Sequence, residues 1–198
     1  DLINKLAQEI RLRKYSSQTE KAYVRVITNF LKSGKEPKEF LSSFTDRNRS
    51  TMRGIFFALK FFYENVLDES FDDKKMPLAK NILKLPNVLN KNEVLQMIKL
   101  TENLKHRLVL MFLYYAGLRL DEVRNLEFSN LDFDRDLIHI QHAKGDRERV
   151  VFLHQQLKDI IKIVGLEGKS FIFKSAGNER YNKRTIEQIV KNASKRAG

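Results

Sequence analysis

The residues best suited to chemistry are cations placed at turns and at a helix start. Arg119 lies in a turn between two expected helices, and Glu122 follows within reach of that turn. Lys144 stands where an expected strand enters a glycine-containing turn. Residues 47–53 (RNRSTMR) put cations and hydroxyls at a helix start, where free backbone N–H groups already favour phosphate. Of these three places, residues 47–53 predict the binding of a phosphate from the residue pattern itself.

Each of these features also has a purely structural interpretation. An arginine between two helices can cap helix carbonyls, and a lysine at a hairpin turn is ordinarily solvated. His139, His142 and His154 surround the same hairpin, and we interpret them as partly exposed polar groups because none has a ligand partner at metal spacing. No metal site is predicted. The chain has no cysteine, which excludes disulfides and thiolate metal sites.

The charge of the chain is strongly positive and evenly shared. The formal net charge is +12 over 198 residues, with 31% charged and 42% hydrophobic residues. Residues 1–85 hold 17 Lys and Arg against 11 Asp and Glu, and residues 86–198 hold 20 against 14. This distribution favours a polyanion in contact with the whole length of the protein, and an inert basic surface is the alternative. Without a secretory signal or a long apolar span, we expect a cytoplasmic, nucleoid-associated protein.

Apolar periodicity predicts four helices in the first half. They cover residues 2–13, a helix opened by Ser17 and Glu20 at capping-box spacing, a short helix around 40–44, and one capped by Asp46 or Ser50 that runs to about Val66. Residues 67–90 change from an acidic to a basic run and hold two of the three prolines. We interpret this segment as a linker that is extended in part.

The second half alternates helical and strand patterns. Asn90 and Glu93 predict a helix start, and the apolar run 108–115 predicts a helix buried on all sides that Gly117 ends before a second helix begins at Asp121. Residues 137–141 and 150–153 predict a β-hairpin, followed by a helix over 157–164, a short strand at 171–173 and a last helix from Asn182.

Four stretches together resemble one known family. Residues 116–123 (AGLRLDEV) are similar to its first arginine box, and residues 143–151 (AKGDRERVV) to its catalytic-lysine hairpin. Residues 14–23 (KYSSQTEKAY) resemble its opening helices, and residues 89–94 (LNKNEV) the start of its catalytic domain. The family is the tyrosine site-specific DNA recombinases, or phage-integrase family, especially the Xer-like members. The resemblance covers nearly the whole chain, in order.

The resemblance implies a mainly α fold with two domains that close around duplex DNA. Residues 1–84 would form a four-helix core-binding domain, and residues 90–198 an incomplete mixed α/β catalytic domain with a small antiparallel hairpin or sheet. In the implied reaction a tyrosine attacks a backbone phosphodiester, forms a 3′-phosphotyrosyl link and frees a 5′-hydroxyl that attacks the partner strand's link. Because bond energy stays in the ester, neither cofactor nor metal is expected.

The resemblance also assigns roles to residues. Arg119 would bind two non-bridging phosphate oxygens, Lys144 would be the general acid for the leaving 5′-oxygen, and Glu122 would orient Arg119. The expected partners are double-stranded DNA and further protomers in a dimer or tetramer, with no membrane and no small-molecule substrate. We expect hydroxyl and basic side chains of both domains to contact DNA: Ser17, Thr19, Lys21, Arg25, Arg47, Arg49, Arg53, Lys60, Arg147, Lys183 and Arg184.

The sequence departs from the family pattern in one respect. The family's His-x-x-Arg box, a later His or Trp and the nucleophilic tyrosine have no match, and none of the six tyrosines holds the nucleophile position. We therefore expect a truncated piece that binds DNA and cannot cleave it, with doubtful assembly into a tetramer. A naturally short integrase-like protein that occupies DNA without cutting remains an alternative, and a helical RNA-binding protein is a weaker one.

Overall fold

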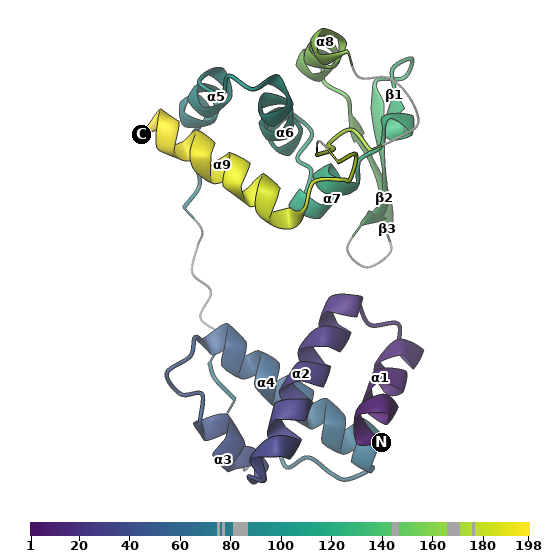
Figure 1. The fold of residues 1–198 in the computed structure, drawn as a ribbon, viewed down its shortest axis with the longest axis vertical. Coiled ribbons are helices and arrows are strands. Elements are labelled where there is room, and N and C mark those ends of the chain that lie inside the picture. Colours follow the sequence, from purple (N-terminus) through teal and green to yellow (C-terminus); the bar gives the residue numbers. More distant parts are fainter. Residues whose placement is uncertain (75, 77, 81–86, 144–146, 166–170, 176) are drawn as a thin grey trace. The chain divides into compact units, whose positions relative to one another are not determined.

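The chain folds into two compact units, each with its own hydrophobic core. In the computed structural model these units are Asp1–Pro86 and Asn87–Gly198 (Figure 1). The structure describes residues 1–74, 76, 78–80, 87–143, 147–165, 171–175 and 177–198. The described residues are mostly helical, with one small antiparallel sheet in the second unit, which confirms the predicted fold class. Within these ranges no helix is long and apolar enough to cross a membrane.

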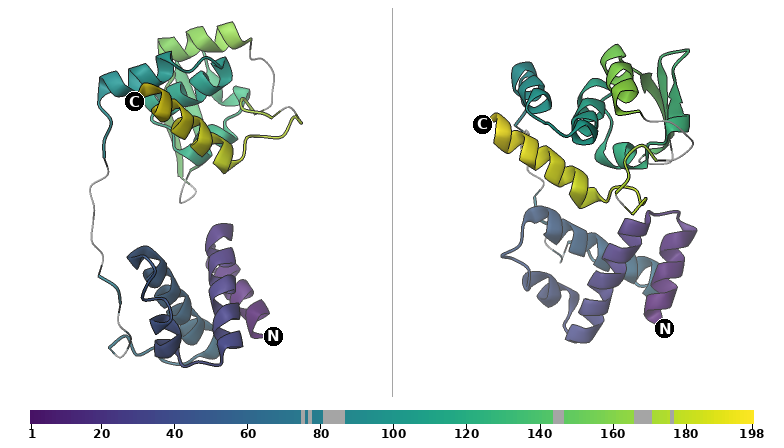
Figure 2. Two further views of the ribbon diagram at one scale, coloured as in Figure 1. Left: turned by 60° about the vertical axis from the view of Figure 1, so that its left-hand side comes forward. Right: turned by 45° about the horizontal axis from the view of Figure 1, so that its top comes forward.

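The first unit is a helical bundle, as the periodicity predicts. Its elements are α1 (Leu2–Leu12), α2 (Ser17–Ser33), α3 (Pro37–Ser42) and α4 (Arg49–Phe62), which continues as a π-helical turn, Tyr63–Leu67 (Figure 2). The core is rich in aromatic rings that meet edge to face, such as Phe30 with Phe40 and Phe62. Such edge-to-face pairs add specific geometry to apolar burial.

Two predicted helix caps in this unit were wrong by one or two residues. Ser16, not Ser17, caps α2, because its hydroxyl accepts a hydrogen bond of 3.2 Å from the backbone N–H of Thr19. Asn48, rather than Asp46 or Ser50, caps α4 through a 2.8 Å bond from the N–H of Thr51. Both capping residues have an extended backbone, the conformation that lets a side chain fold back onto the first turn.

The predicted linker is not free along its whole length. Phe71 packs against Phe56 and Tyr63 of the first unit, with ring centroids 5.4 and 5.7 Å apart. Met76 is buried, and the carbonyl of Ala79 accepts a 3.0 Å hydrogen bond from Arg53 Nη1. Phe71, Met76 and Ala79 therefore pack with the first unit.

The second unit combines helices with a three-stranded sheet that lies at one side of the unit (Figure 1). Its helices are α5 (Lys91–Lys99), α6 (Leu104–Tyr115), α7 (Leu120–Asn125), a 3₁₀ turn (Phe128–Asn130), α8 (Gln155–Val164) and α9 (Lys183–Ala197). The strands β1 (Leu131–Asp132), β2 (Leu137–Ala143) and β3 (Arg147–Phe152) pair antiparallel in the order β1-β2-β3. The predicted cap at Asn90 is confirmed as a full capping box with Glu93.

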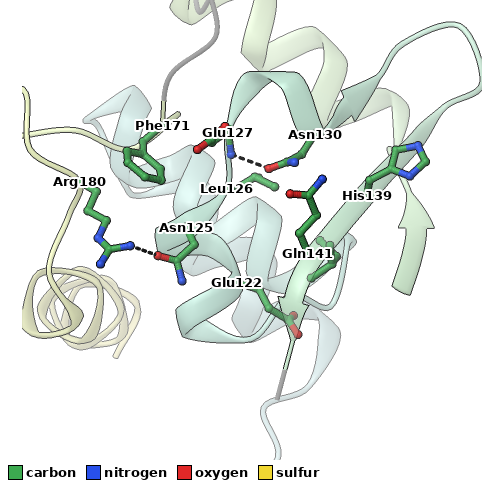
Figure 3. A pocket seen from close by; sticks show the side chains of 10 residues that line it. Glu122, Asn125, Leu126, Glu127, Asn130, His139, Gln141, Phe171 and Arg180 are labelled. Carbon is green, nitrogen blue, oxygen red and sulfur yellow. Dashed lines mark hydrogen bonds between the residues drawn. The ribbon is translucent and has the colours of Figure 1, made fainter. Parts of the chain in front are cut away.

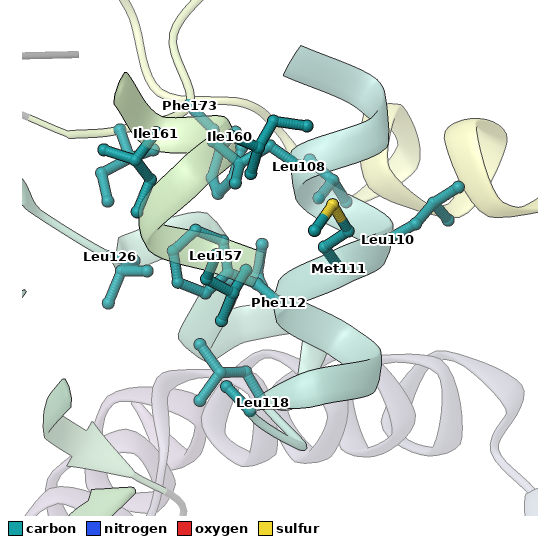
Figure 4. Packing of buried hydrophobic residues seen from close by; sticks show 14 of the residues in the cluster. Leu108, Leu110, Met111, Phe112, Leu118, Leu126, Leu157, Ile160, Ile161 and Phe173 are labelled. Atoms are coloured by element: carbon teal, nitrogen blue, oxygen red, sulfur yellow. The ribbon is translucent and has the colours of Figure 1, made fainter. Parts of the chain in front are cut away.

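The core of the second unit gathers around α6 (Figure 4). Leu108, Val109 and Phe112 are fully buried, and the ring of Phe112 meets Phe173 edge to face at 5.9 Å. The prediction that this helix is buried on all sides was wrong at Tyr114, which is 37% exposed. Helix α6 therefore has one solvent-facing edge. The sequence does not reveal this edge, because a tyrosine in an uncharged run has the same pattern whether its ring is buried or exposed.

The predicted strand at residues 171–173 does not form. Phe171 makes a single bridge with Glu127, and the N–H of Ile172 donates to the carbonyl of Leu126 at 2.9 Å. Ile172 and Phe173 are buried in the core. Three apolar residues thus reflect burial here, because among the described residues this segment is paired by isolated bridges and not by a ladder.

Candidate phosphate-binding site

The end of α6 fixes the position of Arg119. Helix α6 stops at Ala116, and Gly117 adopts a left-handed backbone with φ of +58°, as the sequence predicted. Leu118 is then buried, and Arg119 has an extended backbone as the N-cap of α7. Helix α7 therefore begins one residue earlier than predicted. With Leu118 held in the core, the side chain of Arg119 is directed outward and is 60% exposed.

Glu122 links the backbone and the side chain of Arg119. Its Oε2 accepts a 2.7 Å hydrogen bond from the backbone N–H of Arg119, and its Oε1 accepts a 2.8 Å bond from Arg119 Nη1. The side chain of Glu122 is only 4% exposed. An arginine beside a buried carboxylate loses much of its freedom to rotate, because each oxygen of the carboxylate holds one part of the same residue.

Arg149 of β3 binds the same carboxylate. Its Nη2 donates to Glu122 Oε2 at 2.7 Å and to the carbonyl of Gly117 at 3.1 Å. Burial alone would raise the pKa of Glu122, but hydrogen bonds from Arg149 and from Arg119 outweigh burial and lower that pKa below its ordinary value. Glu122 is therefore anionic at neutral pH. Two guanidiniums share its single negative charge, so the net charge of the three groups is positive.

The free edge of Arg119 suits a phosphate. Among the residues that the structure describes, only Nη1 of its guanidinium has a hydrogen-bond partner. Nε and Nη2 form one edge of the planar group, and these two parallel donors have no partner among the described residues in a side chain that is 60% exposed. Two such donors match the spacing of two oxygens on one phosphate, and the charge persists at any working pH.

The structure describes the other predicted residues of this site only in part. Lys144 lies outside the described residues, so its predicted role stays a prediction. Arg147 begins β3, and its side chain also lies outside what the structure describes. His154 caps α8 and stacks on Tyr115 with ring centroids 5.0 Å apart, which is a structural use of that histidine. Among described residues no cluster of acidic and histidine side chains could hold a metal.

Arg149 was not predicted as a site residue from the sequence, although it lies within residues 143–151, the stretch similar to the catalytic-lysine hairpin. Side chains alternate along a strand, so Arg149 shares the face of Val151, which packs against the core. An arginine on a core-facing side of a strand needs an anion. Arg149 could have been identified from the sequence by pairing a core-facing arginine of this strand with an acidic residue of the turn at residues 116–123.

A separate pocket of about 390 Å³ lies beside α7 (Figure 3). Glu122, Glu127 and His139 line it. Arg180 also lines it, and its Nη1 donates a 2.5 Å hydrogen bond to Asn125 Oδ1. Arg119 does not line this pocket. Two carboxylates and an already paired arginine make it a poor phosphate site, so the exposed guanidinium of Arg119 is the better candidate.

In the first unit the structure brings two predicted DNA-binding residues together. Arg25 of α2 and Arg47, which precedes α4, line a hollow of about 560 Å³ together with Asn48 and Thr51. Lys21 and Arg49 are exposed nearby in sequence. The hollow combines two cations with the N-terminus of a 14-residue helix, the arrangement expected for contact with a phosphate backbone.

Other predicted DNA-binding residues have partners within the protein or lie apart. Arg53 binds the carbonyl of Ala79 and lies over the ring of Phe57, and Lys60 binds Asp73 at 2.6 Å. These two cations anchor the chain that follows α4. The rest lie in the first turns of two helices: Ser17 and Thr19 in α2, and Lys183 and Arg184 in α9 of the second unit.

Comparisons with known proteins place the chain in a family. Residues 87–198 match the model of the phage integrase family, and residues 2–73 match the phage integrase N-terminal SAM-like domain. Tyrosine recombinase XerA of Pyrococcus horikoshii is 25% identical over 212 residues, which cover 100% of this chain and 74% of XerA. An integrase/recombinase of Escherichia coli is 30% identical over 170 residues, which cover 79% of this chain and 50% of the relative.

A solved structure has the same fold. A lambda integrase tetramer bound to a Holliday junction superposes with a TM-score of 0.76 at 14% identity, over 100% of this chain and 65% of that one. The chain spans 74% of the length of the Pyrococcus horikoshii relative and 50% of the Escherichia coli relative. The chain therefore belongs to the phage integrase family, and its relatives in that family include tyrosine recombinases of the Xer type.

Proposed function

We propose that this chain is the part of a DNA strand-exchange enzyme that binds duplex DNA and holds the phosphate to be cleaved. The observation that carries the proposal is the exposed side chain of Arg119, whose Nη1 is held by the buried carboxylate of Glu122 while Nε and Nη2 have no partner among the described residues. A cation held in place before the reaction does not have to be reorganised when charge develops on the phosphate.

The proposed chemistry follows from that arrangement. A tyrosine hydroxyl attacks phosphorus and gives up its proton, the bond from phosphorus to the 5′-oxygen breaks and that oxygen takes up a proton, and the protein becomes linked to the 3′-phosphate. Negative charge grows on the non-bridging oxygens, which Arg119 stabilises with two parallel hydrogen bonds. Lys144 is proposed to give its proton to the leaving 5′-oxygen, a step that an arginine cannot perform because its pKa is too high.

Four of the six tyrosines of this chain lie in positions that do not suit a nucleophile. Burial raises the pKa of Tyr23, Tyr63, Tyr115 and Tyr181, the direction opposite to the one that activates a phenol. Tyr115 also stacks on His154, and Tyr181 on Phe173. The same packing favours a second candidate, an integrase-like protein that occupies DNA without cutting it. That candidate predicts no covalent protein–DNA product from the complete reading frame that contains this chain.

The proposed partners are duplex DNA and further protomers. The net charge of +12, its presence in both halves and the basic hollow at Arg25 and Arg47 support contact with a phosphate backbone. The solved relative is a lambda integrase tetramer bound to a Holliday junction, and we infer from it that protomers of the intact protein assemble on DNA.

The proposed DNA contact is tested by the salt dependence of binding. We expect the affinity of the chain for a duplex to fall steeply with salt, because each neutralised phosphate releases counterions. Arg25→Ala and Arg47→Ala should each reduce the slope of log K against log salt by about 1. The matched control is Lys162→Ala on α8, an exposed cation outside the proposed contact, which should leave the slope unchanged. A flat salt response of the wild-type chain would contradict the proposal.

A further inference from the structure

Arg149 connects the two sides of the turn that carries Arg119. Its Nη2 donates to the carbonyl of Gly117, two residues before Arg119, and to Glu122 Oε2, three residues after it. The arginine comes from β3, which is remote in sequence from both acceptors. The turn is therefore held against the sheet at a point on each side of Arg119.

The shared carboxylate makes this contact relevant to the direction of Arg119. Glu122 is 4% exposed, so its charge must be met by protein donors rather than by water. Oε2 receives Arg149 Nη2 and the N–H of Arg119, which leaves Oε1 for Arg119 Nη1. Without Arg149, the under-satisfied Oε2 would compete for the guanidinium of Arg119 and draw its free edge inward.

The donors of Arg149 do not suit a direct bidentate contact with phosphate. Its Nη2 is already used by two acceptors, and its Nε is buried without a hydrogen-bond partner among the described residues. A planar fork on a phosphate needs two neighbouring free donors. Arg149 has no such pair, whereas Arg119 keeps its Nε–Nη2 edge free.

We propose that Arg149 is a positioning residue, which holds Glu122 and the Gly117 peptide so that the free edge of Arg119 faces the scissile phosphate. This inference rests on the proposed function for its consequence, which is the rate of DNA cleavage. The contact itself is independent of that function, because it is a property of the folded chain.

The kinetic test uses the complete reading frame and a double-mutant cycle. We compare single-turnover cleavage of a nicked duplex by the wild type, Arg149→Met, Glu122→Gln and the double variant. Arg149→Met should lower the cleavage rate by about tenfold or more while the Kd for DNA changes by less than about twofold. In the Glu122→Gln background the same change should have little further effect. Arg149→Lys, which keeps one charged donor, should recover part of the rate.

The kinetic test has one control variant, and two results would contradict the proposal. Arg135→Met removes an arginine from an exposed ion pair with Asp132 in the same unit and should leave the cleavage rate unchanged. An equal loss of rate in both Glu122 backgrounds would overturn the proposal and indicate that Arg149 contacts the phosphate directly. An Arg149→Met protein that is folded and cleaves at the wild-type rate would overturn it as well.

A second measurement separates this inference from the proposed function. In the 198-residue chain, the carboxyl carbon of Glu122 is titrated by NMR in the wild type and in Arg149→Lys and Arg149→Met. The pKa of Glu122 should rise in both variants, and more in Arg149→Met. An unchanged pKa would show that the contact is absent in solution and would refute the positioning role. If the wild-type protein cleaves no duplex, the proposed function fails, and this titration still decides the contact.

Discussion

At the scale of residues, the structure is organised around one buried carboxylate. Glu122 accepts hydrogen bonds from Arg149 and from both the backbone and the side chain of Arg119. The spacing in sequence predicted that Glu122 would reach Arg119. That spacing alone did not identify Arg149, because the side of the strand on which Arg149 lies becomes certain only with the pairing of β2 and β3.

The pH dependence of stability should report on this carboxylate. The pKa of Glu122 is lowered in the folded state, so its stabilising contribution is present above the unfolded pKa and is lost as the pH falls through the folded pKa. We expect Glu122→Gln to reduce the free energy of unfolding by about 1–3 kcal/mol at pH 7. The difference from wild type should shrink as the pH falls below the ordinary range of a glutamate.

The measurement is calorimetric unfolding of the second unit at neutral and acidic pH. Glu127→Gln is the matched control, because Glu127 lines the same pocket, accepts a 3.2 Å hydrogen bond from Ser129 and has no arginine partner among the described residues. The control should change the free energy of unfolding by less than about 0.5 kcal/mol. A Glu122→Gln effect that is the same at every pH would contradict an ionised, arginine-paired Glu122.

At the scale of elements, apolar periodicity predicted the helices better than capping residues predicted where the helices begin. The helices were recovered because apolar residues at intervals of three and four must share a buried face. Their starts were shifted at α2, α4 and α7, because several nearby residues can cap a helix and the backbone conformation selects one. The expected strand at residues 171–173 failed because three apolar residues satisfy burial without a partner strand.

Helix α6 gives the prediction that belongs to this scale. Leu108 is fully buried at the centre of the second core, so Leu108→Ala should reduce the free energy of unfolding by about 2–5 kcal/mol. Tyr114→Ala on the exposed edge of the same helix is the control and should have an effect below about 1 kcal/mol. Thermal unfolding followed by circular dichroism measures both, and equal effects would contradict the burial pattern of α6.

At the scale of the whole molecule, the scatter of the exposed aromatic rings favours duplex DNA over single strands as the proposed partner. Stacking platforms for single-stranded nucleic acid need exposed aromatic rings side by side. Among described residues the exposed rings are scattered over separate elements, and Arg53 covers the ring of Phe57. The sequence predicted the net charge without any structure, but it could not show that Arg53 and Lys60 are paired within the protein.

Competition binding tests this preference. With a labelled duplex bound to the chain, we expect unlabelled duplex of the same length to displace it, and single-stranded RNA to displace it at least about tenfold less well at equal salt, because RNA recognition relies mainly on stacked bases. Fluorescence anisotropy measures both competitors. Equal displacement by RNA would favour the RNA-binding alternative.

The most direct test of the account is strand cleavage by Arg119→Ala in the complete reading frame. With a nicked duplex that traps the covalent product, the wild type should accumulate a protein–DNA adduct. The variant should form it at least about 10²–10³-fold more slowly, since one preorganised donor group is lost, while binding the same duplex with an affinity within about threefold of wild type. Adduct formation by Arg119→Ala at the wild-type rate would contradict the assignment of the phosphate to this arginine.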